Sequence, residues 1–67
     1  MELTIYMENG TTFVTVNPAN FKNKEKLSEF LLTQKIAGNV ITFTSKYYSS
    51  GIDMKKAIGW VISELEF

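Results

Sequence analysis

The dipeptide Asn9-Gly10 lies in the middle of a segment in which apolar and polar residues alternate. Both central positions of a tight hairpin turn need a positive φ, which asparagine and glycine tolerate, so this pair is the strongest short-range signal for a β-hairpin. We expect its two strands at residues 2–8 and 11–17. A chain of 67 residues without cysteine has no disulfide to supplement a small core, and we expect one domain spanning residues 1–67.

The two-residue turn also predicts which residues share a face of the hairpin. One face is expected to carry three cross-strand pairs, namely Met7 with Thr12, Ile5 with Val14, and Leu3 with Val16. The other face is expected to carry Tyr6 with Phe13 and Thr4 with Thr15.

The segment after the hairpin has the start and stop signals of a helix. Pro18 ends the second strand, because proline cannot donate to a strand ladder. Asn23 is a suitable N-cap and Gly38 a suitable stop. Between them, apolar residues recur at helical spacing at Leu27, Phe30 and Leu31. Residues 40–47 then alternate and are rich in β-branched and aromatic types, which predicts a third strand.

A second helix is predicted over residues 54–66. Asp53 is a good N-cap for it, and Gly51 breaks the preceding strand. An apolar stripe follows at helical spacing, formed by Ala57, Ile58, Val61, Ile62 and Leu65. Gly59 costs about 1 kcal/mol relative to alanine inside a helix and weakens this prediction.

The predicted order of elements is therefore ββαβα, an α+β fold. It has a three-stranded sheet, made of the N-terminal hairpin and one further strand, with two helices packed on one face. If the third strand lies beside the first, the covered face carries Leu3, Ile5, Val14, Val16, Ile41 and Phe43. The uncovered face would then carry Thr4, Tyr6, Phe13, Thr15, Val40, Thr42 and Thr44.

Six of the seven lysines flank the starts of the two predicted helices, where the helix dipole disfavours cations: Lys22, Lys24, Lys26, Lys46, Lys55 and Lys56. A right-handed crossover makes the second and third strands run in the same direction, so both helix starts should fall at one edge of the sheet. This predicts a basic edge, with Tyr47 and Tyr48 between its two halves. The acidic residues Glu8, Glu64 and Glu66 should lie toward the opposite edge.

Three interpretations of the basic edge stay open. Lysines near chain turns are most often simply solvated, and an AT-rich genome would account for lysine without arginine. As binding groups, they suit an acidic protein surface, or a single-stranded nucleic acid whose bases stack on the tyrosines. Zero net charge and the absence of arginine favour the protein surface over nucleic acid.

Exposed aromatic residues predict a second contact surface, either with a partner or within a homodimer. Tyr6 and Phe13 are expected on the uncovered sheet face, and Trp60 and Phe67 on the far side of the second helix from its apolar stripe. Tryptophan and tyrosine are favoured interface anchors. Leu32 and Ile36 also fall outside the core stripe of the first helix. Alternatively, Trp60 folds back over the rim of the sheet and the uncovered face is merely wet.

The chain has neither histidine nor cysteine, which removes the usual nucleophile–base pairs and most transition-metal sites. We expect no enzyme, no cofactor and no metal. The first hypothesis is a small interaction or regulatory protein that binds another protein. Its size and composition associate it with phage or mobile-element accessory proteins, such as an inhibitor of a host enzyme or defence complex. The alternatives are a single-stranded nucleic-acid-binding protein and a homo-oligomeric structural component.

The N-terminal residues lack the basic and apolar regions of a signal peptide, and no run of 18 apolar residues occurs. We therefore expect a cytoplasmic protein, in the host cytoplasm if it is of phage origin, with no membrane partner.

Overall fold

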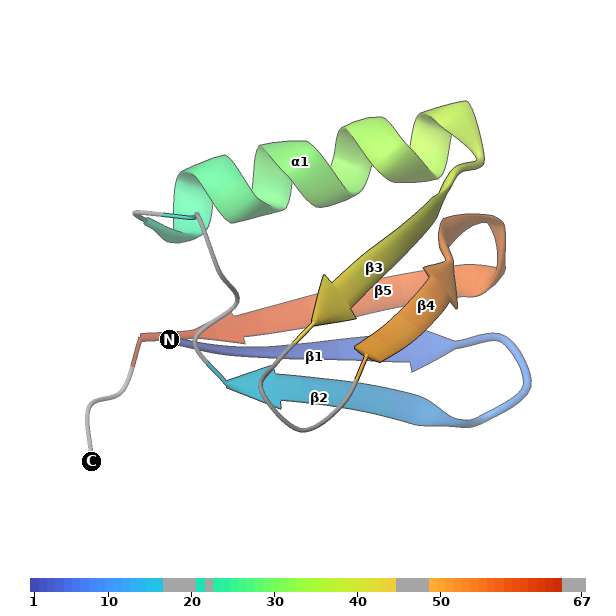
Figure 1. Ribbon diagram of the computed structural model, residues 1–67, viewed down its shortest axis with the longest axis horizontal. Coiled ribbons are helices and arrows are strands. Elements are labelled where there is room, and N and C mark those ends of the chain that lie inside the picture. The colour runs from blue at the N-terminus through green and yellow to red at the C-terminus, as the bar shows by residue number, and fades with distance from the viewer. Residues whose placement is uncertain (17–20, 22, 45–48, 65–67) are drawn as a thin grey trace.

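The computed structural model describes residues 1–16, 21, 23–44 and 49–64 (Figure 1). Its elements, in chain order, are β1 (Glu2–Met7), β2 (Thr12–Val16), α1 (Lys24–Ala37), β3 (Val40–Thr44), β4 (Ser49–Asp53), the short 3-10 helix η1 (Met54–Lys56) and β5 (Ala57–Ser63). The strands form two antiparallel sheets. One has three strands in the order β2-β1-β5, and the other is a ribbon of β3 and β4.

The predicted ββαβα fold with two helices on a three-stranded sheet is wrong. The structure has one α-helix and five strands in two sheets among the described residues, and it is mostly sheet. The segment expected to be the second helix is η1 followed by β5. The third strand, expected beside β1, pairs instead with β4, and β5 takes the place beside β1.

Residues 57–63 are extended because β1 offers them a partner along its whole length. Pairs run from Glu2 with Ser63 to Met7 with Ala57, and Ile58 is the extra residue of a bulge. β-branched and aromatic residues pack well on such a pleated surface. The N-cap predicted at Asp53 is present, since its side chain accepts from the Lys55 amide at 3.1 Å. It starts only the three residues of η1.

The helix α1 agrees with its prediction at both ends. The Asn23 side chain caps it by accepting from the Lys26 amide at 2.9 Å. Gly38 ends it in the left-handed conformation, with φ of 69°, and its amide donates to the Lys35 carbonyl at 3.1 Å. With 14 residues, α1 is too short to cross a membrane, and no helix in the described ranges has the length and apolar character to do so.

The register of the first hairpin differs from the predicted one by a single residue. The Gly10 amide donates to the Met7 carbonyl at 3.0 Å, and the Met7 amide donates to the Thr11 carbonyl at 2.9 Å. Gly10, at φ of 87°, is thus the last of three loop residues rather than the second of two, a known alternative in which a left-handed glycine follows a turn. Ile5 therefore pairs with Phe13 instead of Val14. A slip of one residue turns every side chain of β2 to the opposite face.

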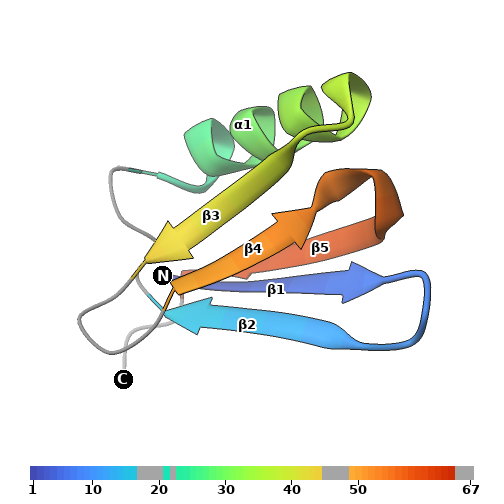
Figure 2. The ribbon, with the colours of Figure 1, turned by 45° about the vertical axis from the view of Figure 1, so that its right-hand side comes forward.

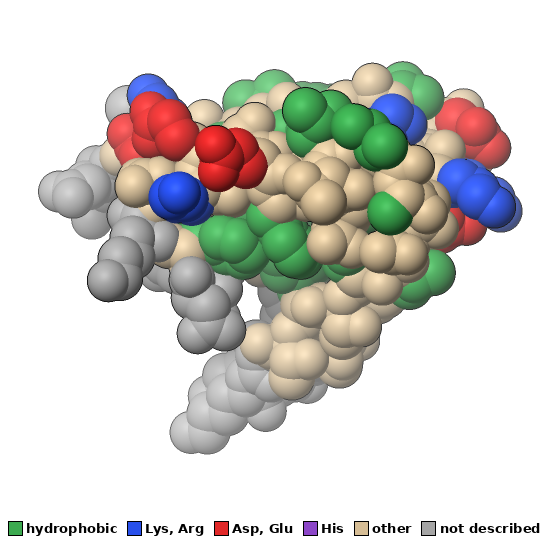
Figure 3. All heavy atoms as spheres, turned by 90° about the horizontal axis from the view of Figure 1, so that it is seen from above, with side chains coloured by type: hydrophobic (Ala, Val, Ile, Leu, Met, Phe, Trp, Pro, Cys, Tyr) green, Lys and Arg blue, Asp and Glu red, His purple; other side chains and the backbone are tan. Residues whose placement is uncertain are grey.

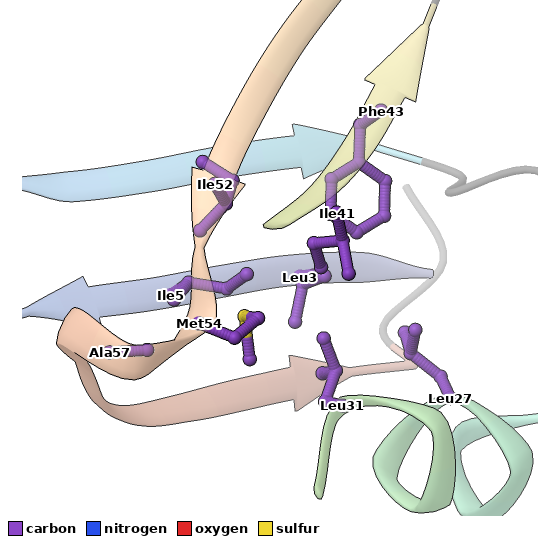
Figure 4. Packing of buried hydrophobic residues seen from close by; sticks show 9 residues of the cluster. All are labelled: Leu3, Ile5, Leu27, Leu31, Ile41, Phe43, Ile52, Met54 and Ala57. Carbon is purple, nitrogen blue, oxygen red and sulfur yellow. The ribbon is translucent and has the colours of Figure 1, made fainter. Parts of the chain in front are cut away.

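One face of the three-stranded sheet is covered by α1 and by the β3–β4 ribbon. Figures 1 and 2 show α1 alongside β5 and the ribbon crossing the sheet between α1 and the β2 edge. The apolar side chains of the sheet, of α1 and of the ribbon converge in the space between them (Figure 4). The buried residues of this core are Leu3, Ile5, Leu27, Leu31, Ile41, Phe43, Ile52, Met54 and Ala57.

Candidate interaction surface

The other face of the three-stranded sheet has no described element packed on it, and we call it the open face. Its residues follow from strand alternation and from the observed register. They form three rows across β2, β1 and β5: Val16, Glu2 and Ser63; Val14, Thr4 and Val61; Thr12, Tyr6 and Gly59.

The open face is apolar and nearly free of charge. Val14, Val16 and Val61 are 50%, 63% and 54% exposed, and Tyr6 is 42% exposed. Among the three rows only Glu2 has a charged side chain, and the hydroxyl groups come from threonine, serine and tyrosine. Such a surface suits contact with another apolar, hydroxyl-bearing surface. None of its nine residues carries the positive charge that drives the binding of phosphate groups.

Two residues of the open face were not predicted to be exposed, because the predicted register of the first hairpin was wrong. Val14 and Val16 were expected in the core, and the three-residue loop turns them outward instead. The same change moves Phe13 and Thr15 from the expected uncovered face to the covered one. Thr15 is buried there, and the Phe13 ring stacks on Phe43 with centroids 5.5 Å apart.

The predicted pair of Tyr6 and Phe13 is therefore not formed. Tyr6 lies opposite Thr12 and keeps its expected place on the open face. Phe13 is partly buried against the core.

Trp60 lies on the covered face, opposite Ile5, and packs against the core. With Ile62 it forms one wall of a pocket of about 310 Å³, and the start of α1 forms the other wall with Lys24, Glu25 and Ser28. Trp60 is therefore a residue of the sheet itself, and not of a helix as both interpretations of the sequence assumed. Phe67 lies outside the described residues.

The four described lysines of the predicted basic edge lie in two places. Lys24 and Lys26 are at the start of α1, while Lys55 and Lys56 are in η1, where the Lys55 side chain lies against Gly38 at the end of α1. The expectation that they share one edge is wrong, because it required a second helix starting beside the first. Lys22, Lys46, Tyr47 and Tyr48 lie outside the described residues.

Acidic groups accompany the described lysines at both ends. Lys24 is 3.7 Å from Glu64, and Lys26 is 3.8 Å from Glu29. At the other end, a backbone hydrogen bond of 2.8 Å from the Glu8 amide to the Lys56 carbonyl places Glu8 next to η1. Figure 3 shows blue and red side chains together at the two ends of the surface seen from the α1 side, with green and tan ones between. The predicted separation of a basic from an acidic edge is therefore not seen in the described part of the chain, and Glu66 is outside it.

Lys35, the one lysine that was not assigned to the predicted basic edge, has a structural contact. It lies in the last turn of α1, and its ammonium group donates to the carbonyl of Ala57 at the start of β5. A cation in the last helical turn is favoured by the helix dipole, and that position is the signal from which its role could have been suspected.

Comparisons with protein-family models, with curated proteins and with solved structures give no match for this chain. Within the described ranges, acidic side chains do not gather in groups of three or more as a metal site needs. The geometry of the open face and of the sheet edges is therefore the basis for the function proposed below.

Proposed function

We propose that this protein is a small binding module without catalytic activity, and that it holds another protein on its open face. The observation that carries the proposal is the exposure of Val14, Val16 and Val61 on a sheet face that no described element covers. Exposed apolar side chains are ordinary when scattered, but contiguous ones mark interaction sites. Here Val14 and Val16 are neighbours on the open face of β2, and Val61 lies in the same row as Val14, on the other side of Thr4.

The chemistry of the face also defines the partner. Tyr6 supplies an amphipathic ring of a type that is common at interface centres. Since Glu2 is the only carboxylate in the three rows, the matching surface should be apolar and uncharged at its centre. This differs from the acidic surface expected from the lysines. The position of the described lysines at two ends of α1 also favours a protein partner over a nucleic acid.

A comparison of three baits in extract of the cells that make this protein tests the proposal. The baits are the wild type, Val61→Lys in the middle row of the open face, and Ile36→Lys as a matched control. Ile36 is an apolar residue of α1 that is 79% exposed. We expect a protein that the wild type and Ile36→Lys retain equally, and that Val61→Lys retains at least about tenfold less, as 1.4 kcal/mol would give.

The proposal fails if no retained protein distinguishes Val61→Lys from Ile36→Lys while circular dichroism shows both variants folded. Titration of a labelled single-stranded oligonucleotide completes the test. Micromolar binding that weakens steeply with salt would overturn the proposal in favour of nucleic acid.

A further inference from the structure

Among the described residues, the outer edge of β2 is an unpaired strand edge. β1 occupies one side of β2, and no described strand or helix lies along the other side in either ribbon view (Figures 1 and 2). An unpaired edge presents a row of N–H and C=O groups with which another strand can pair.

Hydrogen-bond alternation identifies the backbone groups on this edge. The Met7 amide donates to the Thr11 carbonyl, so this pair faces inward across the β1–β2 ladder. Inward and outward residues alternate along an antiparallel strand, so Phe13 also faces β1. The backbone N–H and C=O groups that point away from β1 are therefore those of Thr12, Val14 and Val16.

These outward groups complement a second copy of themselves. In an antiparallel pairing centred on Val14, each Val14 lies opposite its own counterpart, and Thr12 lies opposite the counterpart of Val16. All of these positions direct backbone groups toward the other strand, so each becomes a hydrogen-bonded pair. A pairing centred on Phe13 or on Thr15 would match only two of these three residues and would leave the third opposite a position outside β2.

The side chains of this segment suit two-fold pairing as well. Residues 9–21 contain no charged residue, so symmetry brings no like charges together. The strand itself reads Thr-Phe-Val-Thr-Val and consists of β-branched and aromatic types that favour sheets. Its five pairs with β1 run without a bulge.

Two of the other outer strands, β5 and β4, are less suited to such pairing. β5 has α1 alongside it, a bulge at Ile58, and its Ala57 carbonyl accepts from Lys35. Bulges and lysines are among the devices that keep sheet edges from pairing. In the ribbon, β4 contains Ser49, Ser50 and Gly51, which makes it a weak template.

We infer that two copies of this chain associate through antiparallel pairing of their β2 strands, which joins their sheets into one of six strands. The two-fold axis is perpendicular to the sheet, so both open faces lie on the same side and form one wider face. This inference concerns the edge of the sheet and not its face, so it stands or falls independently of the proposed function.

Sedimentation velocity from about 1 to 200 μM tests the inference with two matched variants. Val14→Lys places two lysines opposite each other on the axis. Val61→Lys puts the same residue in the same row of the open face, on β5, and Val61 and Val14 are 54% and 50% exposed. We expect dimers for the wild type and for Val61→Lys, and a dissociation constant at least about tenfold higher for Val14→Lys.

Amide hydrogen exchange of the wild type gives a second readout that needs no variant. Raising the protein concentration should slow exchange at Thr12, Val14 and Val16 and leave Phe13, which is bonded to β1 in either state, unchanged. A monomeric wild type at 200 μM, dimers that persist in Val14→Lys as in Val61→Lys, or concentration-independent exchange at Val14 would each overturn the inference.

Discussion

The two outer strands of the three-stranded sheet, β5 and β2, flank the same central strand and have opposite surroundings. Along β5 lie α1, a bulge and the Lys35 ammonium group, whereas along β2 no described element lies. Both strands are rich in β-branched residues, so their own composition does not distinguish them. The difference comes from α1, which is distant in sequence from β5 and packs on that side. An edge strand is therefore protected or left open by elements elsewhere in the chain.

The largest expected effect on stability comes from removing a buried contact of α1, the helix that lies along β5. Leu31→Ala deletes a side chain with 0% exposure, and such deletions cost about 2 to 5 kcal/mol. For so small a domain this is much of the free energy of unfolding. The neighbouring Leu32, 51% exposed on the same helix, is the control, and Leu32→Ala should change the value by less than about 0.5 kcal/mol. Urea denaturation measures both, and equal losses would show that α1 does not hold the β5 side through Leu31.

The end of α1 gives the second test. Gly38 has φ of 69°, and a Cβ there would lie 3.2 Å from a carbon of the Lys55 side chain, so Gly38→Ala should cost about 1 to 2 kcal/mol. Gly59, on the open face, does not have a positive φ, and a Cβ added to it would meet nothing within 4 Å. Gly59→Ala should be neutral or stabilise by up to about 1 kcal/mol, through the entropy of the unfolded chain. Thermal unfolding of the two variants should shift in opposite directions or only for Gly38→Ala, and a larger loss for Gly59→Ala would contradict the assigned conformations.

The smallest expected effect on stability comes from removing the Lys35 contact at the β5 edge. Lys35→Met keeps most of the side-chain length and removes the donor to the Ala57 carbonyl, at a cost of about 0.5 to 1.5 kcal/mol. Lys26→Met removes only an exposed pair with Glu29 and should cost at most about 0.5 kcal/mol. Chemical denaturation measures the stabilities. Amide exchange near Ala57 should accelerate only in Lys35→Met, and its acceleration in both variants would mean that Lys35 has no special role at this edge.

The part of the fold that the sequence predicted well is the part whose signals are local. Asn23 and Gly38 bound α1 through contacts within a few residues of themselves, and Leu27 and Leu31 are buried as the spacing indicated. Ile41 was also placed correctly in the core. Capping and helical periodicity act over one or two helical turns, so both can be recognised within a short stretch of sequence.

The part that failed depends on partners far away in the chain. The apolar residues of 57–63 fit a helical stripe, and only the availability of β1 decides that they are extended. The register of β2 depends on whether Gly10 is the second residue of a two-residue loop or the third residue of a three-residue loop. The Asn-Gly pair is compatible with both loops. Both errors also made the prediction of the open-face residues wrong. Without the register, Val14 and Val16 looked like core, and without β5 the outward position of Val61 was not predictable.

The central position of β1 also has a consequence for the order of events during synthesis. β1 is made from residues 2–7, and its second neighbour is made from residues 57–63. During synthesis, both edges of the first hairpin stay unpaired until residues 57–63 have emerged from the ribosome. Pairings between such distant segments also slow folding. Nascent chains on the same messenger could therefore meet through their hairpins before residues 57–63 of either have emerged, and the pairing of β5 then ends the exposure of the β1 edge alone.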